Sequence, residues 1–269
     1  MTVDYRTRDR VQAEALAFRQ RHNALDWNAD VDDLIKLHGL AHDRYSRFGR
    51  LGDVARFTTD VAKKVLALVS LKESVILTST ELPSAKEPFA KGHELGHAVL
   101  PWHRDILYVC DEHDLSAATR AQMEWEANTF SAAVILPRPL VETMYENFPV
   151  SMDTVRKLAD LSGASVAASA NAYIEHFPKP GLLMWLKEED GELVLTRKRL
   201  SRSAVGTPLS RLQVGQRFSS RHTPWVNSRT RYSTQSCRLR FTNGPDKYYS
   251  VSVFNNGYTV YALEWDPEA

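Results

Sequence analysis

Residues 93–97 read HELGH, and this pentapeptide combines two histidines with a glutamate that could together bind and use a metal ion. His93 and His97 are four positions apart, so on an α-helix their imidazoles lie one turn apart on one face. That geometry lets two ring nitrogens reach one zinc ion, and Glu94 could then act as general base towards a water molecule. A chance occurrence of the pattern is the alternative. We expect one Zn²⁺ ion per chain.

The sequence MEWEANTF, on a second predicted helix, offers two carboxylates as a third ligand. A helical projection places Glu124 on a largely apolar face and Glu126 on the polar side. A buried carboxylate needs a partner, which a metal ion or an arginine would provide. We expect Glu124 to complete the metal site, Asn128 to orient a ligand histidine through a hydrogen bond, and Glu126 to be solvated.

The connector between these helices contains three candidate electrophiles for a tetrahedral intermediate, namely His103, Tyr108 and His113. For each of them a structural or surface role is the alternative. Cys110 could bind metal, but with two histidines and a glutamate available it is expected to pack as a small apolar residue. Three protein ligands and an open fourth position are typical of a catalytic zinc site, whereas a fourth protein ligand would indicate a structural one.

The elements that position these residues are predicted to be mainly helical, with a small sheet. Ser84 and Glu87 form a predicted capping box at the start of the HELGH helix, with Pro88 in its first turn and Pro101 at its end. The other predicted elements of this half are helices over 10–22, 29–39 and 116–136, and strands over 65–70 and 74–79.

The second part of the chain changes from helices to hairpins. Helices are predicted over 152–163 and 164–177, and the spacing within 151–177 resembles a helix-turn-helix. Its second helix carries no Lys or Arg among its first residues, so DNA binding through it is not expected. We expect this helix to pack against the core of the domain that holds the HELGH helix. Beyond it, hairpins are predicted around Asp190-Gly191 and Asn256-Gly257, which gives a small antiparallel β-rich domain.

A change in composition near residue 180 predicts a domain boundary. Between Lys187 and Lys247 the chain carries 13 Lys/Arg against 5 Asp/Glu, although the whole chain has a net charge of only +1. We expect a first domain over 1–178 and a basic β-rich domain over 179–269. The basic region could hold nucleic acid, an anionic ligand or an acidic partner, or be a solvated surface. We interpret it as a regulatory or substrate-docking module.

The composition also indicates a compartment. No apolar run approaches the length of a membrane span, and the first residues lack the apolar core of a signal peptide. The two cysteines lie far apart in sequence, so a disulfide framework is not expected. A cytoplasmic protein with no membrane partner is predicted.

The segment FAKGHELGHAVL, followed by EWEANTFSAAVILP, resembles the paired motifs of the ImmA/IrrE family of metallopeptidases. The chain departs from the family pattern at Ser131, where alanine is usual, and at VILP, where LLMP is usual. The resemblance covers roughly residues 10 to 177. The motif positions that match are His93, Glu94, His97, Glu124, Ala127, Asn128, Phe130 and Pro137.

This resemblance implies a mainly helical, zincin-like (gluzincin-type) metallopeptidase domain with a small sheet, so that the whole chain would be α+β. It also implies a zinc-dependent endopeptidase that cleaves a helix-turn-helix repressor or an antitoxin and thereby triggers a stress or mobile-element response. The alternative is a non-proteolytic, zinc-stabilised binding protein. Such a protein would sequester a repressor or toxin, or contact nucleic acid through the basic C-terminal region.

Overall fold

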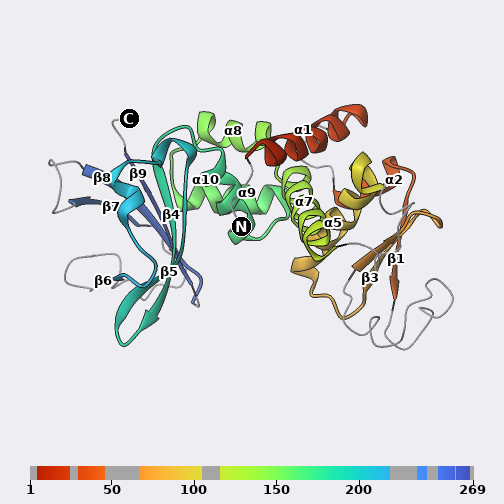
Figure 1. Ribbon diagram of the computed structural model, residues 1–269. Helices are drawn as coiled ribbons and strands as arrows, with labels where there is room; N and C mark the ends of the chain where they lie inside the picture. Colours follow the sequence, from red (N-terminus) through yellow and green to blue (C-terminus); the bar gives the residue numbers. More distant parts are fainter. Residues whose placement is uncertain are drawn as a thin grey trace. The chain divides into compact units, whose positions relative to one another are not determined.

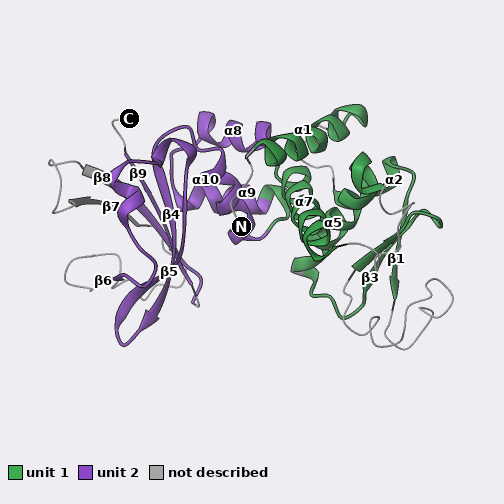
Figure 2. Cartoon of the chain, viewed as in Figure 1, with its two compact units in different colours: residues 1–137, 161–164 green, residues 138–160, 165–269 purple. Residues whose placement is uncertain are grey.

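The structure is a computed structural model that describes residues 5–24, 30–45, 67–104, 116–218, 235–240, 248–257 and 259–266 (Figure 1). The chain divides into two compact units, residues 1–137 with 161–164 and residues 138–160 with 165–269 (Figure 2). Each unit combines helices with a sheet, which confirms the predicted α+β class. The finer assignment to a zincin-like fold stays a prediction.

Unit 1 contains a mixed three-stranded sheet of order β1-β3-β2, in which β2 is antiparallel and β1 parallel to β3. Strand β1 was not predicted, because its sequence AHDRY is polar and lacks the alternation of a half-buried strand. The elements of this unit are α1 (Tyr5–Arg21), α2 (Val31–Leu37), β1 (Ala41–Tyr45), β2 (Ala67–Ser70), β3 (Val75–Ser79), a 3₁₀ turn (Ser84–Lys86), α5 (Glu87–Val99) and α7 (Ala117–Ile135).

Helix α5 is the centre of this unit, since it contacts β2 and β3 as well as α7, which in turn contacts α1. The helices bury one continuous apolar core, and this burial is the main favourable contribution to their stability. The fully buried side chains include Phe18 of α1, Ile76 of β3, Leu95 of α5 and Phe130 of α7. The core therefore holds α5 and α7 in fixed register, which any shared site between them requires.

The predicted capping box at the start of α5 is wrong. Lys86 is the N-cap of α5 and makes no side-chain capping bond, and Ser84 instead begins the 3₁₀ turn. The Glu87 carboxylate binds Arg44 of β1 and Lys91 of α5 instead of Ser84, and its distance to Lys91 Nζ is 3.0 Å. Lys91 also pairs with Asp32 of α2 at 2.9 Å. Partly buried ion pairs therefore link α2 and β1 to α5.

Unit 2 contains a six-stranded antiparallel sheet of order β6-β5-β4-β9-β8-β7. Its helices are α8 (Arg138–Asn147), most of α9 (Met152–Ser162) and α10 (Val166–Glu175). Its strands are β4 (Gly181–Glu189), β5 (Glu192–Leu200), β6 (Arg217–Phe218), β7 (Gln235–Arg240), β8 (Tyr248–Asn255) and β9 (Val260–Trp265), with 3₁₀ turns at Arg202–Ala204 and Pro208–Arg211.

Both predicted hairpins are present. Asp190 and Gly191 join β4 to β5 with φ of 53° and 77°, the left-handed conformations that a two-residue type I′ turn requires. Gly257, with φ of 91°, lies in the turn between β8 and β9. Glycine and aspartate at these positions explain why the hairpins could be located from the sequence.

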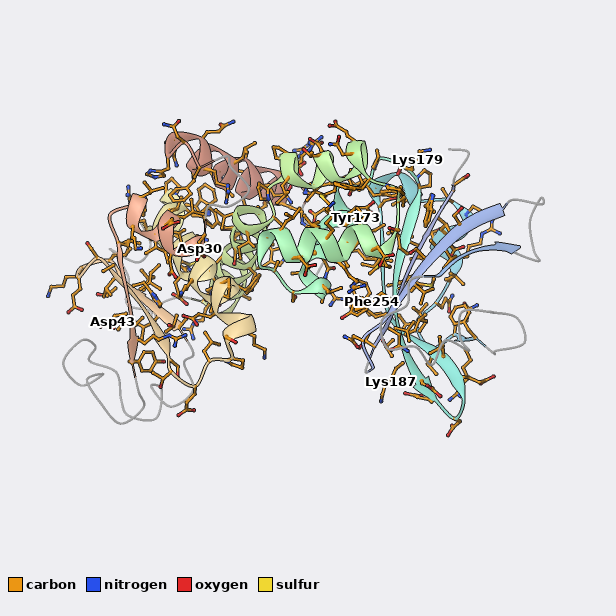
Figure 3. The ribbon with its side chains drawn as sticks, turned by 180° about the vertical axis from the view of Figure 1, so that it is seen from behind. Asp30, Asp43, Tyr173, Lys179, Lys187 and Phe254 are labelled. Atoms are coloured by element: carbon orange, nitrogen blue, oxygen red, sulfur yellow. The ribbon has the colours of Figure 1, made fainter. Side chains whose placement is uncertain are left out.

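The helices of unit 2 pack against its own sheet. Helix α10 contacts β4 and β5, and Arg199 of β5 donates hydrogen bonds to Asn171 and Glu175 on that helix. Tyr173 of α10 (labelled in Figure 3) stacks on Phe177. Within unit 2, α10 therefore packs on β4 and β5, and polar side chains of the helix bind the sheet.

The compact units separate at Pro137, whereas the predicted boundary between functional domains lies at residue 178. Compactness and functional assignment are different criteria, so the boundary at 178 stays a prediction. None of the described helices combines the length and apolar character that crossing a bilayer would require.

Candidate metal centre

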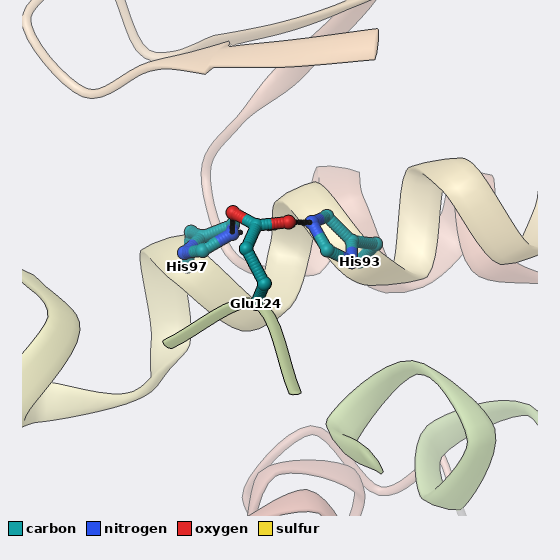
Figure 4. Close-up of side chains that lie close together, drawn as sticks. All are labelled: His93, His97 and Glu124. Atoms are coloured by element: carbon teal, nitrogen blue, oxygen red, sulfur yellow. Dashed lines mark hydrogen bonds and ion pairs between the residues drawn. The ribbon is translucent and has the colours of Figure 1, made fainter. Parts of the chain in front are cut away.

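His93 and His97 of α5 and Glu124 of α7 bring three potential ligand atoms together (Figure 4). His93 Nε2 lies 3.2 Å from His97 Nε2. The Glu124 carboxylate lies 3.3 Å from His93 Nε2 and 3.5 Å from His97 Nε2. Ligand atoms about 2.0–2.1 Å from a tetrahedral zinc ion are roughly 3.3–3.4 Å apart, so the spacing of this cluster fits such an ion.

The outer ring nitrogens of the two histidines are also bonded. His93 Nδ1 lies 3.1 Å from Asn128 Oδ1, and His97 Nδ1 lies 3.1 Å from His103 Nδ1. Because a carbonyl oxygen only accepts, His93 donates through Nδ1, and its Nε2 can then carry a lone pair towards the cluster. This is the contact that the sequence predicted for Asn128, and its role in orienting a ligand stays a proposal.

The electrostatics of the cluster favour positive charge. When His93 and His97 carry a proton on Nε2, their hydrogen bonds to Glu124 lower the pKa of this glutamate far below its usual value. Burial lowers the pKa of His93, but Glu124, Glu94 and Asn128 outweigh that effect and the pKa is raised overall. A site that stabilises a proton in this way also suits a divalent cation, which would compete with that proton.

The predicted burial of the two glutamates on α7 is wrong. The side chain of Glu124 is 54% exposed, whereas the side chain of Glu126 is only 3% exposed. Helix α7 packs against both α1 and α5, and its buried face runs through Met123, Glu126, Ala127 and Phe130. Glu124 still reaches both histidines from the edge of that interface. The prediction that Glu124 has a partner therefore holds, and that partner is the histidine pair. The reason given for it does not hold, because the carboxylate is half exposed.

The other candidate residues differ in where they lie. Glu94 of α5 follows His93 in sequence, and it is buried, with 8% of its surface exposed. His103 is fully buried, and both of its ring nitrogens are within hydrogen-bonding distance of protein atoms, which favours a supporting role over that of an electrophile. Tyr108, His113 and Cys110 lie outside the described residues.

Two glycines allow α5 and α7 to approach closely enough for Glu124 to reach the histidines. A Cβ atom at Gly96 would lie 3.1 Å from Phe130 Cδ1 and 3.3 Å from Ala127 Cα. A Cβ atom at Gly92 would lie 2.6 Å from Ser131 Oγ. Ser131 Oγ in turn donates a 2.8 Å hydrogen bond to the Phe89 carbonyl, so serine at this position adds a polar link between the helices.

Replacing Gly96 with valine is expected to separate α5 from α7. The larger side chain cannot fit against Phe130 and the Ala127 backbone, and overpacking of this kind costs about 1–3 kcal/mol. The free energy of unfolding, measured by urea titration of the full chain, should fall by that amount. Zinc affinity should fall with it, because Glu124 moves away from the histidines.

Ala121→Val provides the matched control, since Ala121 is exposed on α7. Equal stability losses for Gly96→Val and Ala121→Val would contradict the close-packing role of Gly96.

A helix carrying two histidines, faced by a glutamate from a neighbouring helix, is the arrangement of ligands found in three-ligand metal centres, and it could hold a metal ion here. Residues 52–172 match the model of the IrrE N-terminal-like domain. These matches support a relationship of this segment to the ImmA/IrrE family of metallopeptidases. The segment also includes α8, α9 and most of α10, although these helices lie mainly in unit 2.

One curated relative and one solved structure extend this comparison. The radiation response metalloprotease IrrE of Deinococcus radiodurans is 29% identical over 111 residues, which are 40% of this chain and 33% of the relative. The match thus spans about a third of that protein. A transcriptional regulator of Mycobacterium tuberculosis shares the fold with a TM-score of 0.57 at 12% identity, over 96% of this chain and 76% of that chain.

Proposed function

We propose that this protein is a cytoplasmic zinc-dependent endopeptidase that cleaves a regulatory protein. The observation that carries the proposal is the convergence of His93, His97 and Glu124 at the spacing of a tetrahedral zinc ion. The match to the IrrE N-terminal-like domain supports it, because the matched segment is the one that holds these residues. A bound zinc ion would supply Lewis-acid chemistry by activating water and polarising the scissile carbonyl.

The residues of the chain would then have distinct tasks. His93, His97 and Glu124 hold the ion, and Asn128 keeps the His93 ring in the orientation that directs Nε2 towards it. Glu94 takes the proton of the attacking water and passes it to the leaving amine, acting first as base and then as acid. The burial of Glu94 limits its contacts with solvent. Its negative charge also acts on His93 and raises the pKa of that histidine.

We further propose that the substrate is a helix-turn-helix repressor or an antitoxin, and that its cleavage triggers a stress or mobile-element response. The resemblance of the paired motifs to the ImmA/IrrE family motivates this substrate class. The basic β-rich region over 179–269 would dock the substrate or receive a regulatory ligand. A repressor encoded beside this gene is the first substrate to test.

Removal of zinc should abolish cleavage. The full chain, treated with a chelator and then dialysed, is expected to leave the repressor intact, and addition of about one equivalent of Zn²⁺ should restore cleavage. Fragments are measured by mass spectrometry, which also gives the scissile bond. Repressor incubated with Zn²⁺ alone is the control.

Cleavage that persists after chelation would overturn the metallopeptidase proposal. A zinc-loaded protein that binds the repressor without cutting it would instead favour the binding-protein alternative.

A further inference from the structure

A buried chain of hydrogen bonds runs from the outer nitrogen of His97 into the protein. His97 Nδ1 lies 3.1 Å from His103 Nδ1, and His103 Nε2 lies 2.8 Å from Glu126 Oε2. His103 is 0% exposed and Glu126 is 2% exposed. The chain links α7 to the HELGH helix on the side away from the metal cluster.

The far end of this chain has a fixed direction, because Glu126 is surrounded by donors. Trp102 Nε1, which can only donate, gives a 2.6 Å hydrogen bond to Glu126 Oε2. Gln122 Nε2 donates to Oε1 at 2.9 Å. Both oxygens are therefore acceptors, and His103 must donate to Glu126 through Nε2.

The direction of that bond determines the rest of the chain. A neutral imidazole has one donor and one acceptor nitrogen, so His103 accepts through Nδ1 when it donates through Nε2. His97 must then donate through Nδ1, which leaves Nε2 with its lone pair. His97 Nε2 is the atom that lies 3.2 Å from His93 Nε2 and 3.5 Å from Glu124.

We propose that Glu126 and His103 are positioning residues that hold His97 in the tautomer whose Nε2 is free to bind metal. The purpose of this arrangement rests on the proposed zinc peptidase function. The tautomer of His97 can nevertheless be tested without zinc and without a substrate. His93 is oriented by the exposed Asn128, whereas His97 is oriented by two buried groups. Asn128 and Glu126 therefore give both ligand histidines the same tautomer by different means.

A buried polar pair is costly unless its hydrogen bonds are satisfied, and apolar side chains of similar volume could fill the same space. What the polar pair adds is an acceptor for His97 Nδ1. When a residue that hydrogen-bonds the outer nitrogen of a ligand histidine is replaced, metal affinity typically falls by about 10- to 100-fold.

The tautomer of His97 can be measured directly, without metal or substrate. In metal-free protein labelled with ¹⁵N-histidine, at a pH well above the usual histidine pKa, NMR should show His97 protonated at Nδ1. His103→Phe should abolish this preference, because phenylalanine keeps an aromatic ring but offers no acceptor. A wild-type His97 protonated at Nε2 would overturn the proposal, whatever the protein proves to cleave.

Zinc affinity provides the second measurement, by competition with a chromophoric chelator. His103→Phe is expected to bind zinc about 10- to 100-fold more weakly than the wild type. His103→Gln should bind zinc within a few-fold of the wild type. The amide of glutamine, like a neutral imidazole, offers one acceptor for His97 and one donor for Glu126. His22→Phe is the matched control, since His22 packs against Phe18 and not against a candidate ligand.

Two failures are distinguishable. A wild-type protein that binds no zinc contradicts the proposed function and leaves the tautomer measurement standing. Folded His103→Phe protein that binds zinc as tightly as the wild type contradicts the positioning role alone.

Discussion

Glu94→Gln protein is expected to bind zinc like the wild type but to cleave its substrate about 10²- to 10⁴-fold more slowly. Glutamine keeps the size and shape of the side chain, yet it cannot take a proton from water. Since Glu94 lies next to His93 on α5 and is not in the three-residue metal cluster, its loss should leave the cluster intact. The measurements are kcat on the cleaved repressor and the zinc content of the purified protein.

Glu73→Gln is the control for this experiment, because Glu73 is an exposed acid in the turn between β2 and β3. It should leave both kcat and zinc content unchanged. Unaltered cleavage by Glu94→Gln protein would show that Glu94 is not the general base and that the proposed assignment of roles is wrong.

Glu264→Gln is expected to stabilise the protein strongly at alkaline pH. Glu264 of β9 is 1% exposed and shares a face of the second sheet with Leu182 and Val251, its partners on β4 and β8. In the part of the chain that the structure describes, neither of its carboxylate oxygens has a hydrogen-bond partner. Burial raises the pKa of Glu264 to about 8, from 4.5.

The raised pKa fixes the sign of the effect. The folded protein keeps the proton of Glu264 at pH values where the unfolded chain has lost it, so stability falls as the pH rises from about 4.5 to about 8. At 1.36 kcal/mol for each pKa unit, the loss at and above pH 8 is about 5 kcal/mol. Glutamine resembles the protonated acid and should remove this dependence.

Urea titrations across this pH range test the prediction. The unfolding midpoint of the wild type should fall with rising pH relative to Glu264→Gln, and the two should converge near pH 4.5. Glu146→Gln, at an exposed position on α8, is the control and should follow the wild type. A constant difference between Glu264→Gln and the wild type at all pH values would refute the titration of Glu264.

Local signals in the sequence explain which elements could be predicted. The helices α1 and α2 follow apolar residues at helical spacing, and the hairpins follow Asp-Gly and Asn-Gly turns, because these signals act over a few residues. Strand β1 was missed because, among the described strands, it pairs with β3, about thirty residues away, and its own sequence has no strand pattern. Pairing over that distance leaves no local trace.

The spacing of His93 and His97 is enough to place them on one helical face and to predict a following helix with Glu124 and Asn128, because helical spacing depends on local geometry alone. Which side of α7 is buried depends on contacts between helices, and so it could be read only from the folded protein. Packing against both α1 and α5 buries Glu126 and leaves Glu124 half exposed at the edge, the reverse of the prediction. The same packing brings His103 to Glu126, since contacts between separate elements depend on how the whole core closes.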